Sequence, residues 1–138
     1  DLICVPGGIG RTGINKDDMD DKKYFIKMSG NATFKVAVKR MTDVIREALE
    51  FNSLSLEDVG LLIPHQANQR IIRAVSERLN YPIEKVFMNI HKYGNTSGAS
   101  IPIGIDEAKR NGRINSGDIS VLGAVGAGLT WGSAVIKW

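Results

Sequence analysis

The sequence predicts a layered α/β fold with a mixed, mostly parallel five-stranded sheet. Short apolar runs alternate with longer segments whose apolar residues recur at helical spacing, which is typical of β-strands connected by α-helices. The last two apolar runs instead follow one another across the turn Gly126-Ala127-Gly128, which indicates an antiparallel pair at one edge. A chain of 138 residues with 43% hydrophobic residues suits one such domain.

The first expected elements are a short strand and a long helix. An apolar run at residues 2–5 ends at Pro6-Gly7-Gly8, as a strand often does. The Gly-rich and then charged stretch 8–23 is expected to be an exposed loop. A helix is expected over residues 31–51, because its apolar residues form one stripe. The stripe consists of Phe34, Val38, Met41, Ile45 and Leu49.

The middle of the chain predicts two more strands with a helix between them. Ser55 and Asp58 indicate a short capped turn, and the apolar run at 59–63 indicates a buried strand. Asn68 is a candidate N-cap for the following helix, and a further strand is expected at 86–90. The apolar residues of the helix share one face: Ile71, Ile72, Val75 and Leu79.

The last third of the chain predicts one helix and the final strand pair. The helix is expected over residues 101–111 and should stop at Gly112. Its start is rich in small residues, which indicates that another part of the molecule approaches its backbone closely. Strands are expected at 119–124 and 133–136.

Charge and composition exclude several classes of function. The net charge of +3 is small, and no basic cluster is interleaved with aromatic residues, so nucleic-acid binding is not indicated. No apolar run approaches the roughly 20 residues that span a bilayer, and no signal-peptide pattern is present. The single cysteine, Cys4, excludes an internal disulfide and fits a reducing compartment. We therefore expect a cytoplasmic protein that binds neither nucleic acid nor membrane.

Two patterns suggest ligands but do not fit their context. Residues 8–13 match the G-x-G-x-x-G pattern of dinucleotide-binding proteins, yet the acidic stretch that follows has no apolar face and cannot open the required helix. We interpret residues 8–13 as a flexible loop. His65 and His91 match no compact metal-ligand spacing, and no thiolate joins them, so no metal site is expected.

Polar side chains follow two expected strands. His65 comes directly after a buried strand and just before a helix, and Asn95 lies at a second strand-to-helix junction. Ligands of open α/β sheets bind at such strand ends. A neutral His65 and Asn95 can both donate hydrogen bonds, and two donors aimed at one oxygen form an oxyanion hole. The alternative is that His65 only caps a helix and Asn95 only makes a turn.

Four segments resemble one enzyme family. Residues 59–71 resemble the histidine motif of β-ketoacyl-acyl carrier protein synthase III, a member of the thiolase superfamily. Residues 93–102 resemble the family's asparagine motif, and residues 126–134 resemble its C-terminal glycine turn and last strand. Residues 28–35 are similar to the entry of one of its long helices. The resemblance implies a thiolase-like C-terminal half as the fold.

The resemblance also implies a reaction. The family joins an acyl group from acyl-coenzyme A to malonyl-acyl carrier protein, releases carbon dioxide and starts fatty acid synthesis. Its catalytic residues are a cysteine, a histidine and an asparagine, and the last two match His65 and Asn95. The cysteine carries the acyl group as a thioester, while the histidine and asparagine stabilise the enolate oxygen. No cofactor is implied, and the family forms homodimers.

Further site residues follow from the same resemblance. The implied carrier-protein contacts are Gln66, Ala67, Asn68, Gln69, Arg70 and Lys35. The implied lining of the coenzyme A and pantetheine tunnel is Gly30, Asn31, Phe34 and Asn68. The acyl pocket and thioester oxyanion site are implied at Val125, Gly126 and Ala127. Lys39 and Arg73 could extend the basic docking face, but ordinary solvated helix faces explain both residues better.

The chain departs from the family pattern at the nucleophile. Cys4 lies in an expected strand and lacks the family's cysteine motif, so we interpret it as a structural thiol. Residues 1–138 are therefore expected to be one C-terminal domain of a longer condensing enzyme whose N-terminal half holds the cysteine. Val125 and Ala127 also depart, and they leave the acyl preference open. The alternatives are a condensing enzyme of specialised metabolism and a non-catalytic module that binds carrier protein or coenzyme A.

Overall fold

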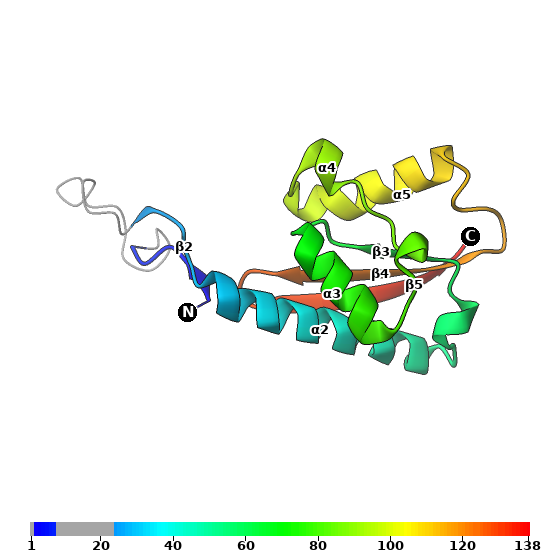
Figure 1. The fold of residues 1–138 in the computed structure, drawn as a ribbon, viewed down its shortest axis with the longest axis horizontal. Coiled ribbons are helices and arrows are strands. Elements are labelled where there is room, and N and C mark those ends of the chain that lie inside the picture. The colour runs from blue at the N-terminus through cyan, green and yellow to red at the C-terminus, as the bar shows by residue number, and fades with distance from the viewer. Residues whose placement is uncertain (1, 8–23) are drawn as a thin grey trace. The chain divides into compact units, whose positions relative to one another are not determined.

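The computed structural model describes residues 2–7 and 24–138 (Figure 1). It divides into two compact units, Asp1–Val36 and Ala37–Trp138, and each is described by itself. The expected loop 8–23 and the glycine pattern within it lie outside the described residues. Within the described residues, none of the helices has the length and apolar character of a membrane span.

The first unit contains a small antiparallel pair of strands and the start of a helix. Strand β1 (Ile3–Cys4) pairs with β2 (Lys27–Met28). Helix α2 (Gly30–Phe51) begins directly after β2. The carbonyl oxygen of Leu2 accepts hydrogen bonds from the Ser29 N–H at 2.9 Å and from the Thr33 hydroxyl at 3.2 Å. These bonds tie the first turn of α2 to the strand that contains the half-buried Cys4.

A three-stranded sheet organises the second unit. Its strands are β3 (Leu61–Pro64), β4 (Ile119–Gly126) and β5 (Thr130–Lys137), in the order β3-β4-β5. β3 runs parallel to β4, and β5 runs antiparallel to β4. The expected antiparallel edge pair is therefore confirmed, with both strands longer than the sequence indicated. The α/β layering is confirmed as well.

The expected five-stranded, mostly parallel sheet is wrong in its strand count. The strand at 2–5 pairs with β2 in a separate sheet, and the strand at 86–90 is reduced to one parallel bridge between Val86 and Leu62. The physical reason lies at Pro64 and Gln66. In the register of this bridge the next ladder bond would run from the N–H of residue 64 to the Phe87 carbonyl, but proline has no N–H, and the amide of Gln66 bonds the Phe87 carbonyl oxygen and the Asn89 N–H instead.

Helices cover both faces of the sheet (Figure 1). Successive residues of a strand point to opposite faces, so Leu122 and Gly123 of β4 mark the two sides. A Cβ built on Gly123 would lie 2.9 Å from Cδ1 of Ile45, which places α2 against that face. On the other face, helix α5 (Ser100–Arg110) contributes Ala108 to a core with Ile63 and Leu122. Helix α3 (Gln69–Leu79) lies beside α2, joined to it by a hydrogen bond from Arg46 to the Arg78 carbonyl.

Short helical turns connect these elements. The turns in chain order are η3 (Leu56–Asp58), η4 (Ile83–Lys85), α4 (Ile90–Tyr93) and η5 (Ser97–Ala99). The expected capped turn is confirmed, because Ser55 and Asp58 form a capping box at η3. Asn68 is confirmed as the N-cap of α3, since its Oδ1 accepts the Arg70 N–H at 2.8 Å. Gly112 follows the end of α5 with a φ of +66°, a conformation that favours glycine.

Candidate active site

His65 lies at the carboxyl end of β3, where the strand meets the start of α5. Its backbone N–H donates to the Gly123 carbonyl at 2.7 Å, which continues the β3–β4 ladder by one residue. Its side chain is half-buried, and the ring Nδ1 is 2.6 Å from the hydroxyl oxygen of Ser100. Nδ1 is therefore occupied, and among the described residues nothing bonds Nε2, which is the ring nitrogen left for a ligand.

Burial sets the protonation state of His65. Desolvation lowers the pKa of the imidazole below its usual value of 6.5. Among the residues that the structure describes, no carboxylate forms an ion pair with the ring, so nothing offsets this effect. The ring is therefore neutral at pH 7. A neutral imidazole has one N–H donor and one acceptor nitrogen.

Ser100 explains the small residues at the start of α5. The side chain is 2% exposed and occupies the first turn of the helix. Its hydroxyl oxygen accepts the backbone N–H of Gln66 at 3.2 Å in addition to its contact with His65. The sequence pattern predicted a close approach at this helix start, but it assigned no role to Ser100. The helix start approaches the end of β3, as these two contacts show.

Gln66 is a structural residue in this fold. Its side chain is 1% exposed, and its amide nitrogen donates to the carbonyl oxygens of Pro64 at 2.8 Å and Phe87 at 3.2 Å. Its amide oxygen accepts the N–H groups of Asn89 at 3.0 Å and Ile90 at 3.2 Å. Gln66 is therefore removed from the predicted carrier-protein contacts, because a buried side chain offers no surface to a docked protein.

Asn95 is exposed on the loop between α4 and η5. Its Oδ1 accepts the Ser97 N–H at 2.9 Å, which forms a local turn as the alternative interpretation expected. Gly94 before it has a φ of +69°. The turn holds the amide oxygen, and within the described chain the amide nitrogen of Asn95 has no partner. The turn therefore leaves the amide N–H groups of Asn95 available to a ligand. A role in the turn and a role in catalysis are compatible.

One segment, residues 97–100, contacts both predicted catalytic side chains. It contributes the Ser97 N–H to Asn95 and the Ser100 hydroxyl to His65. Each contact engages one polar atom of the side chain. The amide nitrogen of Asn95 and Nε2 of His65 stay available to a ligand. That these two atoms converge on one ligand oxygen stays a prediction.

The other predicted site residues are distributed over both units. Gln69 and Arg70 are exposed on the first turn of α3, and Ala67 before them is half-buried. Asn68 uses its side-chain oxygen as a helix cap. Apart from Asn68, the residues predicted for the tunnel lie in the first unit, as does the predicted basic contact Lys35, and their pairing with His65 stays a prediction. They are Gly30, Asn31, Phe34 and Lys35.

The predicted acyl-pocket residues lie at the turn between β4 and β5. Val125 pairs with Trp131 across the two strands, Gly126 pairs with Thr130, and Ala127 is exposed in the turn. Trp131 is 44% exposed, and the guanidinium carbon of Arg40 lies 4.5 Å from the centroid of its ring. The sequence analysis missed this cation–π pair, since its members are far apart along the chain.

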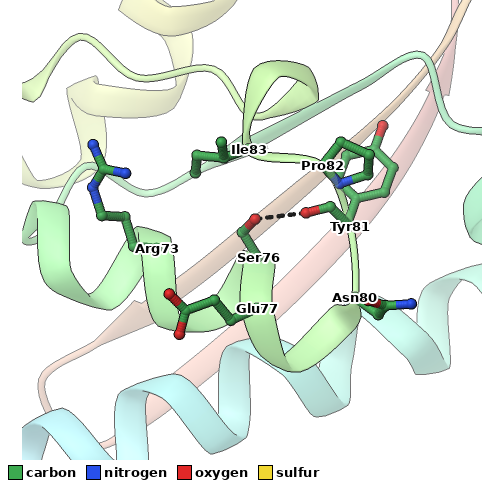
Figure 2. A pocket seen from close by; sticks show the side chains of 7 residues that line it. All are labelled: Arg73, Ser76, Glu77, Asn80, Tyr81, Pro82 and Ile83. Carbon is green, nitrogen blue, oxygen red and sulfur yellow. Dashed lines mark hydrogen bonds between the residues drawn. The ribbon is translucent and has the colours of Figure 1, made fainter.

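A cavity of about 380 Å³ lies away from these residues, at the end of α3 (Figure 2). Its lining consists of Arg73, Ser76, Glu77, Asn80, Tyr81, Pro82 and Ile83. The Ser76 hydroxyl donates to the Tyr81 carbonyl at 2.6 Å, the bond drawn in Figure 2, and the Tyr81 hydroxyl donates to the Val59 carbonyl at 2.8 Å. Both hydroxyls are therefore engaged in hydrogen bonds to the backbone. Within residues 2–7 and 24–138, no cluster of side chains could hold a metal ion.

Comparison with known proteins gives a consistent match. Residues 49–138 match the family model described as 3-oxoacyl-[acyl-carrier-protein (ACP)] synthase III C terminal. A protein of Rhodopirellula baltica named beta-ketoacyl-[acyl-carrier-protein] synthase III is 44% identical over the whole chain, and the chain covers 40% of its length. An Aquifex aeolicus protein of the same name is 53% identical over 86% of the chain and 38% of its own length.

Solved structures give the same result. The crystal structure of 3-oxoacyl-[acyl-carrier-protein] synthase III from Aquifex aeolicus is 52% identical and superposes with a TM-score of 0.81, over 86% of the chain and 38% of its own. The corresponding enzyme from Pseudomonas aeruginosa is 36% identical with a TM-score of 0.86, over all of the chain and 41% of its own. The chain thus spans about two fifths of the length of these relatives.

Proposed function

The chain belongs to the 3-oxoacyl-[acyl-carrier-protein] synthase III family, and from this membership we propose that it supplies the histidine and asparagine of a decarboxylating Cys-His-Asn active site. The proposed reaction joins an acyl group from acyl-coenzyme A to malonyl-acyl carrier protein and gives 3-oxoacyl-acyl carrier protein and carbon dioxide. Its proposed setting is the start of fatty acid synthesis. The family match covers residues 49–138, which include both His65 and Asn95.

The observation that carries the proposal is that the segment 97–100 holds both side chains by hydrogen bonds from Ser97 and Ser100. The Ser97 N–H engages the oxygen of Asn95, and the Ser100 hydroxyl engages Nδ1 of His65. The atoms left are the Asn95 amide nitrogen, which is a donor, and Nε2 of His65. A pair of neutral N–H donors suits an oxygen on which negative charge develops.

The proposed chemistry uses these donors during loss of carbon dioxide. The bond between the malonyl α-carbon and its carboxylate breaks, and the electron pair forms an enolate on the thioester. His65 and Asn95 donate to the enolate oxygen, and each such donor contributes about 3–4 kcal/mol to the transition state. The α-carbon then attacks the acyl thioester on the cysteine, and the cysteine thiolate leaves. A carboxylate at either position would repel the enolate.

The remaining parts of the proposal rest on the relatives and on exposed residues. The cysteine is proposed to come from a part of the protein outside these 138 residues, because the chain spans 40% of the Rhodopirellula relative and Cys4 lies in β1. Acyl carrier protein is proposed to dock at Gln69 and Arg70 on α3, with Lys35 of α2. A cytoplasmic homodimer completes the proposal, and that part rests on the family resemblance alone.

The experiment compares two histidine variants of the full-length protein. His65→Ala is expected to keep acylation of the cysteine by acyl-coenzyme A and to lose release of carbon dioxide from malonyl-acyl carrier protein. His91→Ala is the matched control, because His91 is the other histidine and is exposed on α4. Decarboxylation at the normal rate by His65→Ala would contradict the assigned role. Binding of carrier protein without any turnover in the unmodified protein would favour a non-catalytic binding module.

A further inference from the structure

The hydroxyl proton of Ser100 has one acceptor in the described structure. Ser100 is buried, and a buried hydroxyl proton requires a hydrogen-bond acceptor. The hydroxyl oxygen makes two contacts, one with the Gln66 N–H at 3.2 Å and one with Nδ1 of His65 at 2.6 Å. The Gln66 N–H can only donate, so the oxygen accepts that bond. Among the described residues, Nδ1 of His65 is thus the group left to accept the hydroxyl proton.

The opposite tautomer, with the ring proton on Nδ1, would leave a buried donor without an acceptor. If Nδ1 of His65 carried the ring proton, both it and the Gln66 N–H would donate to the Ser100 oxygen. The Ser100 proton would then be buried without an acceptor, which costs about as much as a lost hydrogen bond. The backbone N–H of Gln66 cannot change its role, because it is part of the peptide chain.

We propose that Ser100 is a positioning residue that keeps His65 in the neutral tautomer with its proton on Nε2. This inference rests on the proposed function, since it explains how His65 becomes a donor toward the enolate oxygen. Ser100 does not touch the substrate in this scheme. It acts through His65 by donating its hydroxyl proton to Nδ1, which leaves the single ring proton on the nitrogen that faces the ligand.

The packing of α5 holds Ser100 at the required distance. Gly104 lies one turn after Ser100, and a Cβ built on it would be 3.1 Å from Cγ2 of Ile63 and 3.4 Å from Cδ1 of Phe87. The helix therefore approaches β3 closely at Gly104, and Ile63 lies two residues before His65 on that strand. The same packing that seats α5 on the sheet brings the Ser100 hydroxyl to the imidazole.

The first test measures the tautomer of His65 directly by ¹⁵N NMR of the full-length protein at about pH 7.5. The proposal expects one neutral form, protonated on Nε2, with Nδ1 accepting a hydrogen bond. A wild-type spectrum in which Nδ1 carries the proton would overturn it. In Ser100→Ala a measurable fraction of the Nδ1-protonated tautomer is expected. A Ser100→Ala spectrum identical to that of the wild type would also overturn it.

The second test separates positioning from structure by kinetics. Ser100→Ala should lower kcat for malonyl decarboxylation about tenfold, the effect of one lost neutral hydrogen bond, while KM and cysteine acylation stay unchanged. Ser100→Thr restores a hydroxyl at this position and should recover most of the rate. Ser116→Ala, at an exposed serine, is the control for the substitution itself. The proposal would be overturned if Ser100→Ala had the wild-type rate. It would also be overturned if Ser100→Thr lost as much activity as Ser100→Ala.

The two proposals fail in different ways. If His65→Ala decarboxylates normally, the proposed function is wrong, whatever the tautomer of the ring. If His65→Ala is inactive but the wild-type ring carries its proton on Nδ1, His65 is still required for decarboxylation, and both the role of Ser100 and the donor role of Nε2 are wrong. The spectrum of the unmodified protein tests Ser100 even if its variants fail to fold.

Discussion

The Nδ1 atom of His65 and the hydroxyl oxygen of Ser100 lie 2.6 Å apart, although 35 residues separate them in the chain. The contact joins the carboxyl end of β3 to the first turn of α5. Because His65 has no carboxylate partner in the described residues, burial of the ring lowers its pKa without an opposing charge. The pH dependence of stability follows from that arrangement.

Stability is expected to fall as the pH is lowered through about 6.5. Burial lowers the pKa of folded His65 below 6.5, the value expected for an exposed histidine of the unfolded chain. Between the two values the unfolded state binds a proton that the folded state does not, so stability rises with pH in this window. Above 6.5 both states are neutral and this contribution is constant. The measurement is denaturant unfolding from about pH 7.5 to about pH 5.5.

His65→Gln serves as the control for this dependence, since glutamine is polar but does not titrate. The stability of the wild type relative to His65→Gln should decline below about pH 6.5. Asp58 and Glu107 also have lowered pKa values, from hydrogen bonds with Ser55 and with Lys92, but carboxyl groups titrate near pH 4, below this window. Parallel pH curves for the two proteins would contradict the lowered pKa of His65.

Gln66→Leu is expected to destabilise the fold by more than about 3 kcal/mol. Leucine fills a similar volume but has no amide. Two backbone carbonyls and two backbone N–H groups therefore lose the hydrogen-bond partner that Gln66 provides. Each buried polar group left unpaired costs about 1–3 kcal/mol. Gln69→Leu is the matched control, because Gln69 is exposed on α3 and should change stability little. Equal unfolding midpoints for the two variants would contradict the structural role of Gln66.

Gln66 also shows what sequence patterns can and cannot predict in this fold. The caps at Ser55, Asn68 and Gly112 were predicted correctly because each depends on residues a few positions apart. The run at 86–90 reads as a strand by its apolar pattern. Its pairing with β3 ends because Pro64 has no N–H for the next ladder bond, and the Gln66 amide bonds the Phe87 carbonyl instead, a contact over 21 residues that no local pattern encodes.

The candidate site divides in the same way. The placement of His65 at a strand end was predicted correctly, whereas Asn95, expected at a second strand-to-helix junction, lies on the loop between α4 and η5 because residues 86–90 do not form a strand. Which polar atom of each side chain would be held, and by which partner, was not. The Ser100 hydroxyl was indicated only as one of several small residues, and its burial against His65 depends on how α5 packs on β3.

Gly123→Ala is expected to destabilise the second unit by about 1–3 kcal/mol. The new methyl group would lie 2.9 Å from Cδ1 and 3.0 Å from Cγ1 of Ile45, a fully buried residue of α2. Overpacking of this kind forces side chains or backbone to shift. Gly132→Ala in β5 is the control, because nothing lies within 4 Å of a Cβ at that position.

A second substitution tests the cause of this loss. Ile45→Val removes Cδ1, the atom closest to the new methyl group. The double variant should therefore be less destabilised than the sum of the two single variants. Additive losses would show that the contact between Gly123 and Ile45 is not the source of the effect.

Arg70→Glu is expected to raise the KM for malonyl-acyl carrier protein at least about tenfold and to change the KM for acyl-coenzyme A far less. Arg70 is exposed on the first turn of α3, five residues after His65, so it lies near the proposed pocket and faces solvent. Acyl carrier proteins are acidic, and reversing a charge at the contact replaces attraction with repulsion.

Arg73→Glu is the matched control, because Arg73 is also exposed on α3 but lines the separate cavity. Raising the ionic strength should weaken the effect of Arg70→Glu, since salt screens exposed charges. Equal changes in KM for both substrates, or equal effects of the two arginine variants, would contradict a docking role for Arg70.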